Sequence, residues 1–254
     1  MSRDGATTFF AGNPGYGVAK DFSVARRDHD AVTVYLDRTF RGGLLAQASY
    51  TASALRGNWA GLFRSETGQL DPNMSSDFDL VSLLPNRSGS LPGDHTHQIK
   101  LYAAKDFDVG QGSSLNVGVA WRSRSGEPTT FLGSHPIYGP GEVYILPRGS
   151  GARLPWVHAV DLRFGARLAL GRASSILLTI DAFNVFNSQA AVARDQRFTL
   201  DSVRPIEGGT TADLARLQTS DGALFDPHHK NPSFGQPIAY QPPRAFRFGI
   251  TTAF

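Results

Sequence analysis

The sequence of 254 residues contains no cysteine, which excludes disulfides and thiolate metal sites. It also lacks any apolar run of about 18 residues, and this excludes a transmembrane helix but not a membrane β-barrel, whose strands alternate only weakly. Lysine occurs only at positions 20, 100, 105 and 230, so the positive charge is nearly all arginine. Arginines scattered over alternating segments favour the lining of a barrel over a nucleic-acid-binding stripe, and we expect no nucleic-acid partner.

The amino terminus, MSRDGATTFFAGNPGYGV, has none of the basic region, apolar region and cleavage site of a secretory signal peptide. An outer-membrane protein requires such a signal, so this start predicts either another location or a natural start further upstream. Catalytic motifs are also missing, since the sequence has no nucleophile elbow, phosphate-binding loop or zincin motif. We therefore predict that the chain is not an enzyme and has no cofactor.

Alternation of apolar and polar residues is the main positive feature, and it is clear at the carboxy terminus. In residues 244–254 the side chains of Phe246, Phe248, Ile250, Thr252 and Phe254 share one face of a strand. A final aromatic residue on such a strand is similar to the signal by which bacterial outer-membrane barrels are recognised for insertion. Comparable alternation predicts about seven strands in all, the others at residues 31–40, 44–54, 97–107, 115–122, 157–170 and 176–182.

The connections between these segments alternate between short and long. Short ones follow residues 40, 107 and 170, and long ones follow residues 54, 122 and 187. Membrane barrels have short periplasmic turns and long extracellular loops, whereas a soluble sandwich has no reason to sort its loops in this way. We therefore predict an all-β fold, an antiparallel transmembrane β-barrel with long extracellular loops. A soluble β domain is the alternative, and it predicts a chain that stays in solution without detergent.

The predicted number of strands is odd, whereas single-chain bacterial barrels have an even number. Together with the missing signal peptide, this predicts that residues 1–254 are the carboxy-terminal segment of a larger barrel, with its plug and amino-terminal domains absent. Such a segment has two unpaired edges, where unsatisfied backbone groups in hydrocarbon are costly. We expect that it does not form a closed, stable monomer by itself.

Several segments, spread over nearly the whole chain, resemble the end of a TonB-dependent outer-membrane receptor. The segment DAFNVFN at residues 181–187 is widely shared in that family, and ILPRGSG at residues 145–151 is similar to the Oar-like group. That group carries a carboxypeptidase-regulatory-like amino-terminal domain. The other matching segments are residues 26–31, 48–51, 55–59, 61–63, 66–73 and 242–244.

The resemblance implies a place in the bacterial cell outer membrane and a role in uptake. Such receptors have a barrel of about 22 strands filled by a plug, and they import scarce ligands with energy passed by TonB. The implied partners are outer-membrane lipid, the barrel assembly machinery through the carboxy-terminal strand, an unknown ligand, and TonB only through the missing amino-terminal part. An adhesion, interaction or structural role without energised transport is the alternative, because long surface loops also suit partner docking.

Two sets of residues are candidates for functional roles. The first lies on the polar face of the predicted strands, where we predict that its members line the lumen; ion pairs between neighbouring strands are favoured there over contact with a ligand. The second is the proposed insertion signal. The lumen-lining set is Arg122, Asp161, Arg163, Arg167, Asp181 and Arg247, and the insertion signal is Phe246, Phe248, Ile250 and Phe254.

Metal ligands are the less favoured interpretation of three further groups, and we predict no metal site. His228 and His229 with Asp226 form one group, but adjacent histidines on an extended chain do not easily face one centre. His95 and His97 share a strand face, and are read as a pair at a strand entry. The third group, a calcium hypothesis for the first long loop, is Asp71, Asn73, Asp77 and Asp79. Aromatic residues in the long loops suit either ligand stacking or ordinary packing: Trp59, Phe63, Phe131, Tyr138 and Tyr144.

Overall fold

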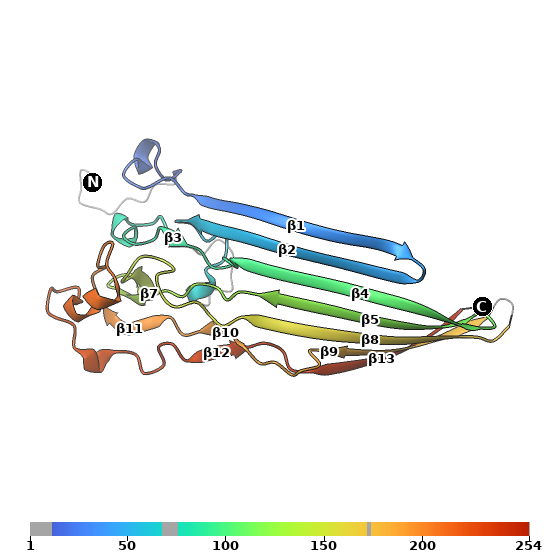
Figure 1. Cartoon of the computed structure of the whole chain (residues 1–254). Coiled ribbons are helices and arrows are strands. Elements are labelled where there is room, and N and C mark those ends of the chain that lie inside the picture. The colour runs from blue at the N-terminus through green and yellow to red at the C-terminus, as the bar shows by residue number, and fades with distance from the viewer. Residues whose placement is uncertain (1–11, 68–75, 172–173, 254) are drawn as a thin grey trace.

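The computed structural model describes residues 12–67, 76–171 and 174–253. Long antiparallel strands lie side by side in one sheet, in the order β1-β2-β4-β5-β8-β9-β13 (Figure 1). A short strand, β3 (Gly89–Ser90), pairs with the end of β2. The seven long strands are β1 (Arg27–Arg41), β2 (Leu44–Gly57), β4 (His97–Gly110), β5 (Ser113–Arg124), β8 (Val157–Ala169), β9 (Ser175–Phe183) and β13 (Ala245–Ala253).

Each segment predicted from alternation corresponds to one of these strands, and the all-β antiparallel fold is confirmed. Two details differ from the prediction. The first strand begins at Arg27 rather than near residue 31, and residues 20–22 are turn and bend, while residues 23–26 have no regular secondary structure. The carboxy-terminal residue, Phe254, lies outside the described residues.

The predicted sidedness of the connections is also present. The short connections β1–β2, β4–β5 and β8–β9 gather at the end of the sheet where the chain ends, and the long ones gather at the opposite end (Figure 1). Gly42 and Gly43 have φ angles of 62° and 71°, and Gln111 and Gly112 have φ angles of 54° and 75°. Positive φ at both central residues matches the twist of a tight hairpin, which explains the glycines in these turns.

The two faces of the sheet differ in polarity. Cross-strand pairing places Val34 opposite Tyr50, Val117 opposite Phe164, and Phe248 opposite Ile180, so these side chains share one face, the apolar face. Large side chains on it are exposed, including Val32 at 71%, Phe248 at 74% and Ile250 at 75%. The opposite, polar face carries Thr, Ser, Gln, Asp and Arg residues. The sheet therefore exposes the large side chains of its apolar face rather than burying them.

The long connections fold into a separate layer, the loop layer, which has its own small core. The layer contains a three-stranded sheet of β6 (Leu132–His135), β7 (Gly139–Tyr144) and β11 (Arg197–Ser202), and a pair of β10 (Ala191–Arg194) and β12 (Pro237–Tyr240). Short 3-10 helices are η1 (Gly17–Ala19), η2 (Ser65–Thr67), η3 (Val81–Leu83), η4 (Thr211–Arg216) and η5 (Pro227–His229). The core of the layer consists of Val143, Ile145, Leu146, Phe198, Val203, Leu217 and Phe225.

From the sequence, residues 211–218 are expected to form a short helix capped by Thr211, and residues 143–146 a short strand. In the structure the helix is η4, and its capping residue is Thr210. The Thr210 hydroxyl and backbone N–H both lie within hydrogen-bond distance of the Asp213 carboxylate. The strand is β7, which begins at Gly139 and ends at Tyr144. Among the described residues, no helix has the length and apolar character needed to cross a membrane.

Candidate functional site

The polar face of the sheet carries ion pairs that run from strand to strand. Arg122 on β5 pairs with Asp161 on β8. Asp181 on β9 lies between two arginines, with Arg163 Nη1 at 3.6 Å and Arg247 Nη2 at 2.8 Å. Backbone register explains this arrangement, because Asp181 is directly opposite Arg163 on one side and Arg247 on the other. Each pair joins neighbouring strands on the face that would be turned away from lipid.

Arg167 lies on the same face, nearer the short turns, and differs from the other members of the set. It is opposite Ser114 and Leu177 in the register, and it has no ion pair within the described residues. It lines a hollow with Asp106 and Asn116. The structure therefore places all six predicted residues on one face but joins only five of them in ion pairs.

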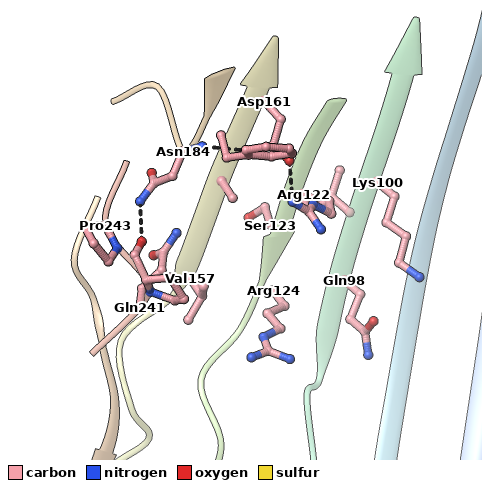
Figure 2. Close-up of a pocket in the computed structure, with 14 residues that line it drawn as sticks. Gln98, Lys100, Arg122, Ser123, Arg124, Val157, Asp161, Asn184, Gln241 and Pro243 are labelled. Carbon is pink, nitrogen blue, oxygen red and sulfur yellow. Dashed lines mark hydrogen bonds and ion pairs between the residues drawn. The ribbon is translucent and has the colours of Figure 1, made fainter. Parts of the chain in front are cut away.

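A pocket of about 530 Å³ opens on the polar face, at the end next to the loop layer (Figure 2). Its lining includes Gln98 and Lys100 from β4, Arg122 and Arg124 from β5, and Asp161 from β8. The chain leading into β13 closes the other side with Gln241, Pro242 and Pro243. The volume is within the range of small-molecule sites, and three of the lining side chains are cationic.

The motif at residues 184–187 builds the wall of this pocket and shows why asparagine is used twice. Asn184 and Asn187 have φ angles of 48° and 52°, a region that asparagine tolerates better than most residues. The Asn184 side chain donates to the carbonyl oxygens of Ser188 at 2.9 Å and Pro242 at 2.8 Å, and its backbone N–H donates to Asp161 Oδ1 at 2.8 Å. Asn187 Oδ1 accepts from the Arg244 N–H at 2.9 Å. The motif thus ties the end of β9 to the start of β13.

A row of stacked rings crosses the apolar face near the loop layer, and sequence reasoning did not identify it. Tyr50, His97, Trp156 and His158 follow one another with ring centroids 6.1, 6.0 and 6.0 Å apart. Tyr50 Oη and His97 Nδ1 are 2.8 Å apart, as are Ser123 Oγ and His158 Nδ1. Amphipathic rings at one level of an apolar face are typical of the aromatic girdle of a membrane barrel. The sequence feature that could have revealed this row is the two-residue period: these four residues continue the apolar positions at the loop ends of their strands.

A buried cluster of charged residues fixes the loop layer, and it was also missed. The guanidinium groups of Arg64, Arg87 and Arg148 lie 5.8, 5.1 and 5.1 Å from the ring centre of Tyr144. Arg148 pairs with Glu66, and Arg64 Nη1 lies 2.7 Å from Glu142 Oε2. Arg87 pairs with Asp77. The Arg148–Glu66 and Arg64–Glu142 pairs join two different long loops, so they hold these loops to one another, whereas Arg87 and Asp77 belong to the same loop.

The environment of this cluster sets its protonation. Burial alone raises the pKa of the Glu66 carboxyl, but the charge of Arg148 and hydrogen bonds outweigh burial and hold that pKa below its usual value. Burial and the neighbouring Glu66 raise the pKa of the Tyr144 phenol, which donates to Glu66 Oε1 at 2.8 Å. Burial lowers the pKa of the Arg87 guanidinium to about 10. At neutral pH Glu66 and Arg87 are therefore charged and Tyr144 is neutral.

The structure corrects one use suggested for the loop aromatics. Tyr144 is only 1% exposed and is enclosed by arginines, so it does not offer its ring to a ligand. Phe131 packs against the core of the loop layer. Phe63 and Tyr138 have exposed side chains, and Tyr138 Oη donates to Asp79 Oδ2 at 3.0 Å.

The histidine and acidic groups considered as metal ligands have other partners. Asp226 accepts from the backbone of His228 at the start of η5, and His229 Nδ1 lies 2.7 Å from Asp201 Oδ2. His95 contacts Ser125 and Glu127 rather than His97. Residues 71 and 73 of the calcium hypothesis lie outside the described residues. In the part of the chain that the structure describes, no group of three or more His, Asp or Glu residues is arranged to hold a metal ion.

These features define a class of protein. Long antiparallel strands present exposed apolar side chains on one face and cross-strand ion pairs on the other, with long loops gathered at one end. That combination is the wall of a transmembrane outer-membrane β-barrel, of which the described sheet is an open portion.

Comparison with known proteins identifies the family. Over the whole of this chain the sequence is 48% identical, across 264 aligned residues, to the TonB-dependent transporter Oar of Myxococcus xanthus. The chain belongs to the TonB-dependent transporters, in the Oar-like group. It spans 25% of the length of that relative. No family model matches the chain, and no solved structure matches it.

Proposed function

We propose that this chain is the carboxy-terminal part of the barrel of a TonB-dependent transporter in the bacterial outer membrane. In this role it contributes wall and outer loops to the uptake of a ligand. The observation that carries the proposal is the continuous apolar face, on which large side chains such as Val32, Phe248 and Ile250 are exposed rather than buried. In water such a surface is unfavourable, whereas in a bilayer it meets acyl chains. Similarity to a protein named as a TonB-dependent transporter supports the same role.

The roles of the candidate residues follow from this proposal. The ion-paired face turns toward the lumen, so Arg122, Asp161, Arg163, Arg167, Asp181 and Arg247 line it. On the apolar face, β13 presents Phe246, Phe248 and Ile250 toward lipid and, with Phe254, provides the signal read by the barrel assembly machinery. The open edges of β1 and β13 pair with further strands of the complete barrel, since an unpaired edge in hydrocarbon is costly.

The absence of native cysteine in this segment makes location and orientation directly testable. Leu224 in the loop layer is 69% exposed, and Val109 beside a short turn is 55% exposed. We expect Leu224→Cys to react with a membrane-impermeant maleimide on intact cells. Val109→Cys reacts only after the outer membrane is permeabilised. Equal labelling of both positions on intact cells, or recovery of the protein in the soluble fraction, contradicts the proposal.

Uptake is tested by the dependence of transport on TonB. Cells with and without this protein, each with and without a functional TonB, are compared for the compounds they deplete from a defined medium. We expect at least one compound whose depletion requires both. Depletion that requires the protein but not TonB excludes energised import.

A docking role at the cell surface is a second candidate, and the loop layer favours it. The layer is a folded unit with its own core and exposes Ile137 at 77% and Leu224 at 69%. Such exposed apolar residues suit contact with a partner. This role predicts a surface-adhesion defect that persists when TonB is absent, which separates it from uptake.

A further inference from the structure

The pocket on the polar face holds more positive charge than its own residues neutralise. Lys100 on β4 is directly opposite Arg122 on β5, and Gln98 is directly opposite Arg124. Residues in register have Cβ atoms about 5 Å apart, and residues two further along the strand remain within reach of long side chains. Lys100, Arg122 and Arg124 therefore lie on one wall of the pocket, with their charged ends pointing in different directions (Figure 2).

Like charges placed directly opposite each other destabilise a sheet unless an anion lies between them. Asp161 is the one acidic residue among the described residues that line the pocket, and its carboxylate already contacts Arg122 and accepts from the Asn184 N–H. Within the described residues neither the Lys100 nor the Arg124 side chain has a hydrogen bond or an ion pair. Glu127, which lies close enough for Arg124 to influence its pKa, is paired with His95.

An independent observation on the opposite wall also indicates a missing occupant. Gln241 is only 6% exposed and lines the pocket. Its Nε2 donates to the carbonyl oxygen of His158 at 2.7 Å, but its Oε1 is buried without a hydrogen-bond partner in the described residues. A buried acceptor left unsatisfied is costly, and a bound molecule with a hydroxyl or N–H donor removes that cost.

From these observations we propose that the pocket binds a small molecule with at least two anionic groups, carboxylate or phosphate. The anionic groups contact Lys100, Arg122 and Arg124, and a hydrogen-bond donor of the same molecule faces Gln241. The inference rests on the proposed function, because it names the chemical class of ligand taken up at the lumen face. A polyanion fits the charge surplus, and the position beside the loop layer is the end that a ligand from outside reaches first.

The test is binding of defined anions to the complete protein purified in detergent from outer membranes. Isothermal titration uses citrate and inorganic pyrophosphate as probes, with glycerol as the uncharged comparison. We expect saturable binding of at least one anion, weakened by added salt, and none for glycerol. Lys100→Gln with Arg124→Gln weakens the binding at least about tenfold, since two charge-assisted contacts are lost.

The matched control is Arg167→Gln, which removes a positive charge from the same face at a distance from the pocket. We expect Arg167→Gln to change the affinity for the anions by no more than about twofold. If the charge of the lumen acted only in general, Arg167→Gln and the double variant would weaken binding to a similar degree. The Gln241 end is tested with citrate against tricarballylate, which lacks the hydroxyl. We expect citrate to bind more tightly than tricarballylate. Gln241→Leu removes that difference in affinity. Equal affinities for the two compounds in the unaltered protein contradict the assignment of a ligand hydroxyl to Gln241.

Two results overturn the proposal. One is the absence of saturable binding of both anions, and the other is an unchanged affinity in the double variant. If the cations instead hold an acidic side chain from elsewhere in the protein, the unaltered protein binds neither probe and the double variant loses thermal stability. All variants are first checked for correct labelling at positions 224 and 109. A failure of labelling rejects the outer-membrane role, while a failure of binding alone rejects only the anion site.

Discussion

The seven-stranded sheet and the loop layer treat apolar and charged side chains in opposite ways. In the sheet, Phe248 and Ile250 are about three-quarters exposed, at 74% and 75%. In the loop layer, Ile145 and Leu217 are fully buried at 0%. The same chain therefore builds one region suited to lipid and another suited to water. Whether an exposed apolar residue stabilises or destabilises a region depends on whether lipid or water surrounds that region.

The charged residues make the same contrast. In the Arg247–Asp181 pair of the sheet, the arginine side chain is 64% exposed and the aspartate side chain is 8% exposed. In the loop layer, the side chains of Arg148 and Glu66 are exposed by 0% and 1%. A pair with one exposed partner is partly screened by solvent and contributes less to stability, whereas breaking a fully buried pair leaves a charge without solvation. The two regions thus depend on their ion pairs to very different extents.

The largest effect is expected where a buried pair is broken. Arg148→Met leaves the Glu66 carboxylate buried beside Tyr144, and we expect the loop layer to lose about 3–5 kcal/mol of stability. The measurement is urea unfolding followed by protease accessibility of the loops in the purified protein. The double change Arg148→Met with Glu66→Leu removes both charges, and it recovers most of the loss. No recovery in the double variant contradicts the assignment of the loss to an unpaired carboxylate.

The next effect distinguishes the two faces of the sheet. Leu101 and Tyr102 are neighbours on β4 with nearly equal exposure, 36% and 38%, but they lie on opposite faces. Leu101→Arg places a charge toward lipid, at a cost of about 2–4 kcal/mol near the bilayer centre, and we expect a lower yield of heat-modifiable protein in outer membranes. Tyr102→Arg faces the ion-paired side and leaves the yield nearly unchanged. Equal effects of the two substitutions indicate that water bathes both faces.

A smaller effect is expected at the corner that joins the two regions. Asn184→Ala removes three side-chain hydrogen bonds and places alanine at a φ of 48°, so we expect a loss of about 1–3 kcal/mol. Asn184→Gly removes the same hydrogen bonds, but glycine adopts this backbone conformation without strain. Its loss of stability is therefore smaller than that of Asn184→Ala by the strain energy of the alanine. The measurement is thermal unfolding of the purified protein. Identical losses in both variants show that the conformation of Asn184 adds no strain.

The same contrast explains how much the sequence reveals. The seven strands and the sorting of their turns were predictable, because a two-residue period and short glycine turns are local signals. The ion-paired residues such as Asp181 were predictable as members of one face. The loop layer was not, because its contacts join distant residues: Arg64 and Glu142 are 78 positions apart. Lys100 and Arg124 were missed for a related reason, since their neighbours depend on strand register.

A minor effect is expected from a pair of the sheet in which only the arginine is exposed. Arg247→Met removes one of two arginines beside Asp181 and leaves Arg163 at 3.6 Å. We expect a loss of about 0–1 kcal/mol in urea unfolding of the purified protein, which is far below the effect of Arg148→Met. The comparison of these two variants measures the contrast between exposed and buried pairs directly. A loss at Arg247 equal to the loss at Arg148 contradicts it.

The smallest effect concerns pH and an exposed pair of the loop layer. A hydrogen bond to Asp201 raises the pKa of the His229 imidazole above its usual value. A raised pKa in the folded state means that the pair stabilises the layer below the unfolded pKa of about 6.5, and that this contribution disappears as pH rises through the folded pKa. His229→Asn therefore lowers the melting temperature slightly at about pH 5.5 and not at about pH 8.5. Asp201→Asn gives the same pattern, because it removes the other partner. A difference from the unaltered protein that grows with pH reverses the sign and excludes this pairing.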